Sequence, residues 1–198
     1  MNFFIATVGR SGSVWLSSTL NRSATHTVLH EVAEPHPDRV VRGHSPFPIE
    51  RFCRPNYGEV HGYLRYSLSP NSLGAEQLIP RRGVLRRDTR AVISSWMNRD
   101  GRVVRDLGAT IHEVVTEQKR LDDWAASDPD ARVFHLEELT DPNSRALEDL
   151  CSWLKLDYVP SAEDKTMVKN ANPSGGFEWN DTSERMLRGV ADRLGLNV

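Results

Sequence analysis

Glycines and hydroxyl side chains surround one arginine near the start of the chain, in the pentapeptide Gly9–Ser13. The pentapeptide follows a short apolar run and precedes an apolar, helix-like pattern that begins near Val14. Backbone N–H groups at a helix N-terminus bind oxyanions, and a guanidinium group can bind two oxygens of a phosphate or sulfate. The residues predicted to hold such an anion are Gly9, Arg10, Ser11, Gly12, Ser13 and Val14.

The loop lacks the lysine of the ATP-binding P-loop. That motif, GxxxxGK[ST], uses its lysine on the terminal phosphates and its hydroxyl group on Mg²⁺. No Gly-Lys pair follows Gly9 at the required distance, and no apolar strand clearly carries an aspartate for Mg²⁺. An ATP- or GTP-dependent phosphotransferase is therefore an alternative rather than the first reading, and a catalytically silent nucleotide-binding module is a third.

A second arginine and hydroxyl group lie within residues 83–96, whose pattern predicts a buried strand, a charged bend and a helix. Arg87 stands at the end of the strand, and Ser95 lies on the first turns of the helix. These two side chains could converge on a second phosphate, about one nucleotide away from the first. Alternatively, Arg87 pairs with Asp88 and Ser95 faces solvent.

These two elements resemble those of the sulfotransferases that use 3′-phosphoadenosine-5′-phosphosulfate (PAPS). In that family a [KR]-S-G-[ST] loop binds the 5′-phosphosulfate, and a later R-[DN]-P-R-x-x-x-x-S element binds the 3′-phosphate. The segments Gly9–Val14 and Arg87–Ser95 are similar to them in order and in the spacing from Arg to Ser. Thr89 stands where the family usually has proline, which is expected to loosen the bend. A fainter similarity extends through residues 133–158.

The resemblance implies a sulfotransferase that moves the sulfuryl group of PAPS to a hydroxyl or amine and releases adenosine 3′,5′-bisphosphate. The implied acceptor is an unidentified small molecule or carbohydrate. Such a transfer requires alignment of the acceptor, stabilisation of charge on the migrating group and removal of the acceptor proton. PAPS supplies the good leaving group, so no metal is required. Arg10 occupies the family's basic position and would stabilise charge on the bridging and leaving oxygens.

Two residues are the main candidates for the base. Residues 39–48, "RVVRGHSPFP", are similar to the strand-then-His-x-Pro element of the cytosolic sulfotransferases, so His44 is the first choice. Imidazole suits proton abstraction near neutral pH. Glu31 is the competitor, because carbohydrate-type relatives use a glutamate soon after the second strand. His30 or Glu34 could share that role.

Short apolar runs alternate with longer amphipathic ones, which predicts an α/β fold in a single domain over residues 1–198. The resemblance refines this to a three-layer sandwich with a central, mainly parallel sheet, like that of the P-loop nucleoside triphosphate hydrolases. The predicted strands are Phe3–Val8, Thr27–Leu29, Arg39–Val41, Gly83–Arg86 and Arg132–Leu136. Because ligands bind outside the carboxyl ends of strands in such sheets, the candidate residues that follow these strands can meet in one crevice.

Helical periodicity is clear in the second half of the chain, from Leu107 to Trp124. Asp141, with Pro142 in the first turn, is predicted to cap a helix that buries Leu147, Leu150, Cys151 and Leu154. Asp181 or Thr182 is predicted to cap a final helix that ends near Gly195.

Residues 45–81 contain five prolines and show no sustained periodicity. They are predicted to form an irregular excursion that binds the acceptor, with one short helix around Gly58–Leu68. Near the C-terminus, Lys165 and Lys169 lie in a polar segment that resembles the loop closing over the 3′-phosphate in the family.

Composition limits the other functions. The net charge of −2, from 25 basic and 27 acidic residues, does not suggest a nucleic-acid partner. The first residues have neither the basic region of a signal peptide nor an apolar run long enough to span a membrane, so a cytoplasmic protein is expected. Cys53 and Cys151 form no CxxC pattern, and the histidines form no compact metal motif, so free thiols and no metal are expected.

Overall fold

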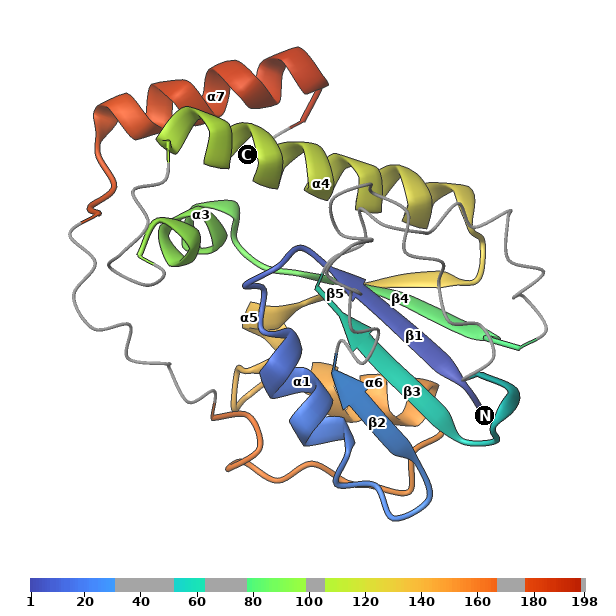
Figure 1. Ribbon diagram of the computed structural model, residues 1–198. Coiled ribbons are helices and arrows are strands. Elements are labelled where there is room, and N and C mark those ends of the chain that lie inside the picture. The colour runs from blue at the N-terminus through green and yellow to red at the C-terminus, as the bar shows by residue number, and fades with distance from the viewer. Residues whose placement is uncertain (31–51, 63–77, 99–105, 167–176, 197–198) are drawn as a thin grey trace, which may run out of the picture.

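The computed structural model describes residues 1–30, 52–62, 78–98, 106–166 and 177–196. Within these ranges, five parallel strands form one sheet in the order β2-β3-β1-β4-β5 (Figure 1). The strands are β1 (Phe3–Thr7), β2 (Thr27–His30), β3 (Tyr57–His61), β4 (Arg81–Arg86) and β5 (Ala131–His135). The predicted α/β class with a central parallel sheet is confirmed.

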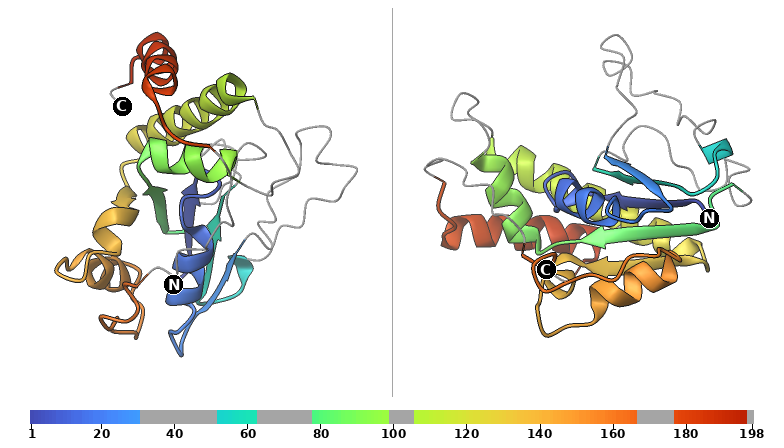
Figure 2. Two further views of the ribbon diagram at one scale, coloured as in Figure 1. Left: turned by 90° about the vertical axis from the view of Figure 1, so that its left-hand side faces the viewer. Right: turned by 90° about the horizontal axis from the view of Figure 1, so that it is seen from below.

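Helices cover both faces of the sheet (Figure 2). One face carries α1 (Ser13–Leu20), α5 (Leu136–Leu139) and α6 (Ala146–Trp153). The other carries α3 (Thr89–Met97), α4 (Leu107–Ser127) and α7 (Asp181–Leu194). Helix α4 packs on the sheet, and α7 packs along α4 (Figure 1).

Strand β1 is buried on both faces, as expected for the central strand of a parallel sheet. Phe3 and Ile5 belong to the core beneath α1 and α6, whereas Phe4 and Ala6 belong to the core beneath α3 and α4. Strands β3 and β4 pair with β1 on either side. The loop that follows β1 therefore emerges at the middle of the carboxyl edge of the sheet.

The helix predicted around Gly58–Leu68 is wrong over residues 58–61, which belong to strand β3. Glycine is required at position 58, because a Cβ there would lie 2.1 Å from Cζ of Phe3. Glu59 is fully buried and its Oε2 accepts a hydrogen bond of 3.2 Å from the Tyr57 hydroxyl. Gly58 and the buried Glu59 are atypical of a strand, which is why the sequence pattern did not predict one here. The rest of the predicted helix lies mostly outside the described residues, as does the predicted strand Arg39–Val41.

Helix α4 confirms the strongest periodic pattern in the sequence. Asp106 caps it, since its Oδ1 accepts a hydrogen bond of 2.7 Å from the backbone N–H of Ala109. Helix α6 buries the predicted apolar residues but begins at Ala146 rather than after Asp141. The Asp141 side chain instead accepts from the N–H of Asn143 at 2.8 Å, which forms a turn ahead of the helix.

Helix α7 ends at Gly195, whose φ of 68° gives the left-handed C-cap that the sequence predicts. Its N-cap is Asn180 rather than Asp181 or Thr182. The Asn180 Oδ1 accepts from the backbone N–H groups of Thr182 at 3.0 Å and Ser183 at 3.1 Å. The cap therefore lies one residue before the first of the two predicted positions.

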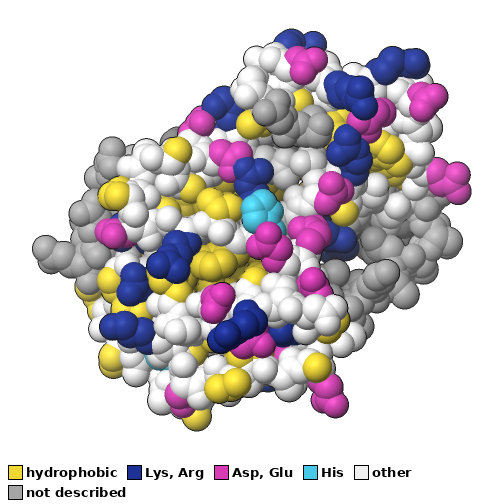
Figure 3. All heavy atoms as spheres, turned by 180° about the vertical axis from the view of Figure 1, so that it is seen from behind, with side chains coloured by type: hydrophobic (Ala, Val, Ile, Leu, Met, Phe, Trp, Pro, Cys, Tyr) yellow, Lys and Arg dark blue, Asp and Glu magenta, His cyan; other side chains and the backbone are white. Residues whose placement is uncertain are grey.

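Acidic and basic side chains are interspersed around apolar ones on the face opposite to the view of Figure 1 (Figure 3). The coloured part of that face carries no broad area of a single charge. Among the helices that the structure describes, none has the length and apolar character needed to cross a bilayer.

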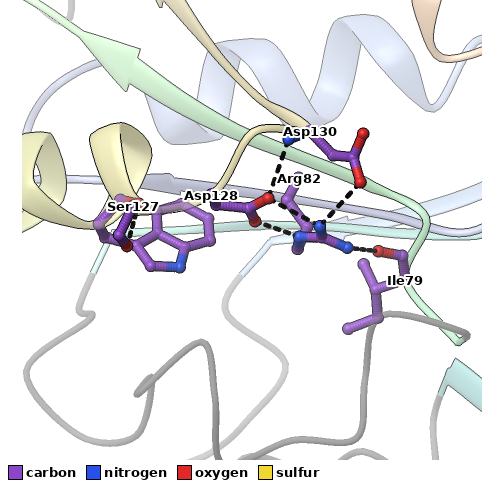
Figure 4. A network of polar contacts seen from close by, with 6 residues as sticks. Ile79, Arg82, Ser127, Asp128 and Asp130 are labelled. Carbon is purple, nitrogen blue, oxygen red and sulfur yellow. Dashed lines mark hydrogen bonds and ion pairs between the residues drawn. The ribbon is translucent and has the colours of Figure 1, made fainter.

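Arg82 fastens the turn between α4 and β5 to strand β4 (Figure 4). Its guanidinium group binds both carboxylate oxygens of Asp128, with an NH2 to Oδ1 distance of 2.8 Å, and donates to the Ile79 carbonyl at 2.9 Å. Both side chains are largely buried, with 11% and 6% exposed. The hydrogen bonds from Arg82 hold the pKa of Asp128 below its ordinary value.

We predict that Arg82→Ala lowers the free energy of unfolding by about 3–5 kcal/mol, because Asp128 is left buried without its partner. Denaturant unfolding measures this loss. Because the folded-state pKa of Asp128 is depressed, the stabilisation is present above its unfolded pKa and disappears as the pH falls through the folded pKa. The wild type and the variant should therefore converge in acid.

Arg120→Ala is the control, because Arg120 is half exposed and pairs with Glu117 at 3.0 Å on the surface of α4. Loss of such a pair costs about 0–1 kcal/mol. Equal losses for the two variants would contradict the role assigned to Arg82.

Candidate functional site

The loop Gly9–Ser13 connects β1 to α1 and bonds to side chains of α3 (Thr89–Met97). Ser95 lies in the last turn of α3, so its predicted place on the first turns of the helix is wrong. Gly12 is the N-cap of α1, with a φ of 90°, and no side chain caps the helix. The backbone N–H groups of the first turn therefore have no partner within the helix, and no acidic side chain lies there. A Cβ on Gly12 would lie 2.9 Å from Leu136, so this position requires glycine for both conformation and space.

Arg10 has a left-handed backbone with a φ of 74°, which costs a non-glycine residue about 1–3 kcal/mol. Arg87 supports this conformation, because its NH1 donates to the Arg10 carbonyl at 2.9 Å. The Arg10 Nε in turn donates to the Ser95 hydroxyl at 3.1 Å. The structure therefore brings together three predicted site residues that are widely separated in the sequence.

The indole of Trp96 adds a further link between α3 and the loop. Its Nε1 donates to the Gly9 carbonyl at 3.1 Å, and the side chain is buried in the core beneath α3 and α4. The loop is consequently held by three separate hydrogen bonds to the segment 87–96. The two predicted anion-binding elements form one continuous unit.

Positive charge is concentrated where these elements meet. Burial is the main cause that lowers the pKa of Arg87 from its ordinary value, and the charge of Arg10 lowers it further, while Glu137 and Asp88 oppose this. Within the described ranges, neither Arg10 nor Arg87 forms an ion pair with a carboxylate. An anion bound beside the two guanidinium groups would relieve their repulsion.

The bend after β4 is held by hydrogen bonds in place of the proline that the resemblance leads one to expect. Asp88 caps α3, with its Oδ1 accepting from the N–H of Ala91 at 2.8 Å. The Thr89 hydroxyl donates to Oε1 of Gln118 at 2.8 Å, and Nε2 of Gln118 donates to the Arg87 carbonyl at 3.4 Å. Thr89 thus links the bend to α4 through a hydrogen bond that a proline at this position could not form.

The remaining predicted residues of the loop differ in their exposure and in their hydrogen-bond partners. Val14 is 61% exposed on the first turn of α1. Ser11 is buried, and its backbone N–H donates to the Val8 carbonyl at 3.2 Å, so this N–H serves the turn itself. The Ser13 hydroxyl is also buried and lies 2.8 Å from Nε2 of His30.

The two predicted bases, His44 and Glu31, lie outside the described residues, as do Glu34 and Lys169. Lys165 is only 7% exposed, and its Nζ donates to the Ser144 carbonyl and pairs with Glu148 of α6 at 3.0 Å. It is therefore engaged with α6 rather than available to a ligand.

Neither Gln118 nor His61 was selected from the sequence as a functional candidate, and His30 was named only as a residue that could share the role of the base. Gln118 lies on α4 and carried no motif. His61 ends strand β3, in register with Ala6 of β1, and its ring stacks on Phe4 with centroids 6.3 Å apart. His30 ends β2 and contacts Ser13. A search for histidines at strand ends would have found His61 had β3 been recognised.

The sheet order, the loop after β1 and the parallel crossovers define a P-loop-like α/β fold. A solved structure of mouse sulfotransferase SULT7A1 complexed with PAP is similar to the chain, with a TM-score of 0.53 and 12% sequence identity. The similarity covers 98% of this chain and 65% of that chain. This chain therefore spans a little under two thirds of that neighbour, and at such low identity the likeness establishes the fold alone.

No protein-family model and no curated protein matches the chain. Both cysteines are free, and burial raises the pKa of the Cys151 thiol to about 12. Within the described ranges, no group of three or more histidine, cysteine or acidic side chains could hold a metal ion.

We predict that Gln118→Leu lowers the free energy of unfolding by about 1–3 kcal/mol, because the Thr89 hydroxyl and the Arg87 carbonyl lose their partner. A double-mutant cycle with Thr89→Val in denaturant unfolding isolates the contact. The double variant should cost less than the sum of the single variants, by about 0.5–3 kcal/mol. Strict additivity would show that Gln118 does not hold the bend through Thr89.

Proposed function

We propose that the chain is a PAPS-dependent sulfotransferase. The observation that carries the proposal is the direct contact of two anion-binding elements through Arg10, Arg87 and Ser95 at the carboxyl edge of the sheet. A nucleotide with anionic groups at both its 5′ and 3′ positions would engage both elements. The fold likeness to a sulfotransferase structure that holds PAP, adenosine 3′,5′-bisphosphate, supports the same ligand class.

The donor groups fit such a nucleotide. In the proposal, the N–H groups of Gly12, Ser13 and Val14, together with Arg10, bind the 5′-phosphosulfate, and the rest of Gly9–Ser13 shapes the loop. Arg87 and Ser95 bind the 3′-phosphate. Ser95 accepts a hydrogen bond from Arg10, so its own proton remains available to a phosphate oxygen. Arg87 uses one of its five N–H groups on the Arg10 carbonyl and keeps others for the ligand.

PAPS supplies a sulfuryl group on a good leaving group. Transfer breaks the S–O bond to the phosphate oxygen and forms an S–O bond to the acceptor, whose proton passes to a base. Arg10 would stabilise the charge that develops on the bridging and leaving oxygens. We propose His44 as the base and Glu31 as the competing candidate. His61 is added as a third candidate because it ends the strand beside β1.

The proposed acceptor is a hydroxyl or amine of a small molecule or carbohydrate, bound by the segment 45–81. Within this segment, strand β3 supplies the rigid part, and loops set on a rigid sheet commonly determine specificity. We further propose that the protein acts in the cytoplasm.

Calorimetric titration with adenosine 3′,5′-bisphosphate, beside ATP with Mg²⁺, tests the ligand class. We predict tight binding of the bisphosphate and weak binding of ATP. Preference for ATP would favour a phosphotransferase, and binding of the bisphosphate without any turnover would favour a catalytically silent module.

Arg87→Ala should weaken bisphosphate binding by about 1.5–3 kcal/mol, because a charged hydrogen-bond donor is lost. The same calorimetric titration measures this loss.

The matched control for Arg87→Ala is Arg90→Ala. Arg90 lies three residues further along the same segment, but its guanidinium group already pairs with Glu184, at 3.0 Å and 2.6 Å. Removing it changes the net charge equally without removing a donor from the site. Similar losses for the two variants would mean that general charge, not a specific phosphate contact, governs the affinity.

Substitution of the candidate bases tests the chemistry. We predict that His44→Ala slows sulfuryl transfer from PAPS by about 10²–10⁴-fold, the usual contribution of a general base. Its affinity for the bisphosphate should stay unchanged. Glu31→Gln and His61→Ala are measured in parallel, and His112→Ala, on the exposed side of α4, is the control. Full turnover in His44→Ala with loss in one of the other two would reassign the base.

A further inference from the structure

A hydrogen bond joins the last residue of β2 to the first residue of α1. It connects Nε2 of His30 with Oγ of Ser13 over 2.8 Å, across 17 residues of sequence. Ser13 is only 5% exposed, whereas His30 is partly exposed at the carboxyl edge of the sheet. The imidazole therefore contacts the anion-binding loop directly, at the residue that opens the helix.

The direction of this bond decides what Ser13 can offer a ligand. A hydroxyl group has one proton and two lone pairs. When Ser13 donates its proton to His30, it can only accept hydrogen bonds, and an oxyanion also only accepts. When Nε2 of His30 carries a proton and donates, the Ser13 hydroxyl accepts that bond and turns its own proton toward the anion. Anion binding at the loop therefore favours His30 with a protonated Nε2.

The positive charges near His30 lie on the side of the loop, where an anion would bind. Helix α1 has no ionisable side chain, but its N-terminus is the positive end of the helix dipole. Arg10 adds a positive charge from the loop. On β3, the register partner of His30 is Val60, and the neighbouring Glu59 and His61 point to the opposite face of the sheet. Glu31 follows His30 in the chain. An anion at the loop offsets the dipole and Arg10, and so stabilises the imidazolium form.

We propose that His30 is a positioning residue of the anion site, and that anion binding is accompanied by uptake of a proton on its imidazole. This assigns His30 to the donor side of the site rather than to proton abstraction from the acceptor. The inference rests on the proposed function only in requiring that the loop bind an anion. Because the bound form carries the additional proton, affinity rises as the pH falls, by at most about tenfold per pH unit.

Calorimetry of the full chain with sodium sulfate, between about pH 5 and 8, where histidine changes its charge, tests the inference. Sulfate remains a dianion throughout this range, so any proton taken up is bound by the protein. Titrations in two buffers of different ionisation enthalpy count that proton. The wild type should take up a proton and bind sulfate more tightly at the acid end of the range.

His30→Gln is the informative variant, because an amide N–H can still donate to Ser13 but does not titrate. We expect it to retain sulfate affinity within a few-fold at the alkaline end and to lose both the proton uptake and the histidine-dependent rise in acid. His112→Gln, exposed on α4, should behave like the wild type. Nitrogen NMR of the histidine rings should show Nε2 of His30 becoming protonated when sulfate is added.

The inference is overturned if wild-type protein binds sulfate without proton uptake, or if His30→Gln keeps the wild-type pH dependence. Parallel titration with adenosine 3′,5′-bisphosphate separates this result from the proposed function. Proton-linked sulfate binding with no preference for the bisphosphate would sustain the role of His30 and refute the nucleotide site. Absence of binding by either anion would overturn both.

Discussion

The hydrogen bond from Arg87 to the carbonyl of Arg10 is the interaction on which the site depends. It holds Arg10 in a left-handed conformation that its side chain disfavours, and so fixes the path of the loop into α1. The bond is possible because β1 and β4 are adjacent, with Thr7 in register with Leu85, so both strands end at the same level. The geometry of the loop is thus set by a strand pairing rather than by the loop alone.

The distribution of charge on the segment from β4 to α3 supports this interpretation. Arg82, Arg86 and Arg90 each pair with a carboxylate, from Asp128, Asp122 and Glu184 respectively. Arg87 lies among them without such a pair in the part of the chain that the structure describes, and its burial lowers its pKa. In a chain with more acidic than basic residues, this arginine keeps its charge available where the loop and α3 meet.

Local patterns in the sequence were sufficient to predict the loop after β1, helix α4 and the α/β class. Each depends on residues close together in the chain or on simple periodicity. Strand β3 was not predicted, because Gly58 and Glu59 have low strand propensity. Their contacts with the Phe3 ring and the Tyr57 hydroxyl become visible only in the folded structure.

Contacts between distant segments were beyond prediction for a different reason. Gln118 lies 29 residues from Thr89, and its role depends on how α4 packs against the bend. The bond between Ser13 and His30 requires the register of β2 on β3, which places the end of β2 beside the start of α1. His44 and Glu31 were predicted from motifs alone and lie outside the described residues.

Two serine hydroxyls border the loop, and their partners make them unequal. Ser95 accepts from Arg10, a group that can only donate, so this bond leaves the Ser95 proton to another acceptor. Ser13 is bonded to His30, whose ring nitrogen can either accept or donate, so the Ser13 proton is free only in one protonation state. If the loop binds an anion as proposed, the Ser95 hydroxyl can donate to it in either protonation state of His30, whereas the Ser13 hydroxyl can do so only when the imidazole carries a proton on Nε2.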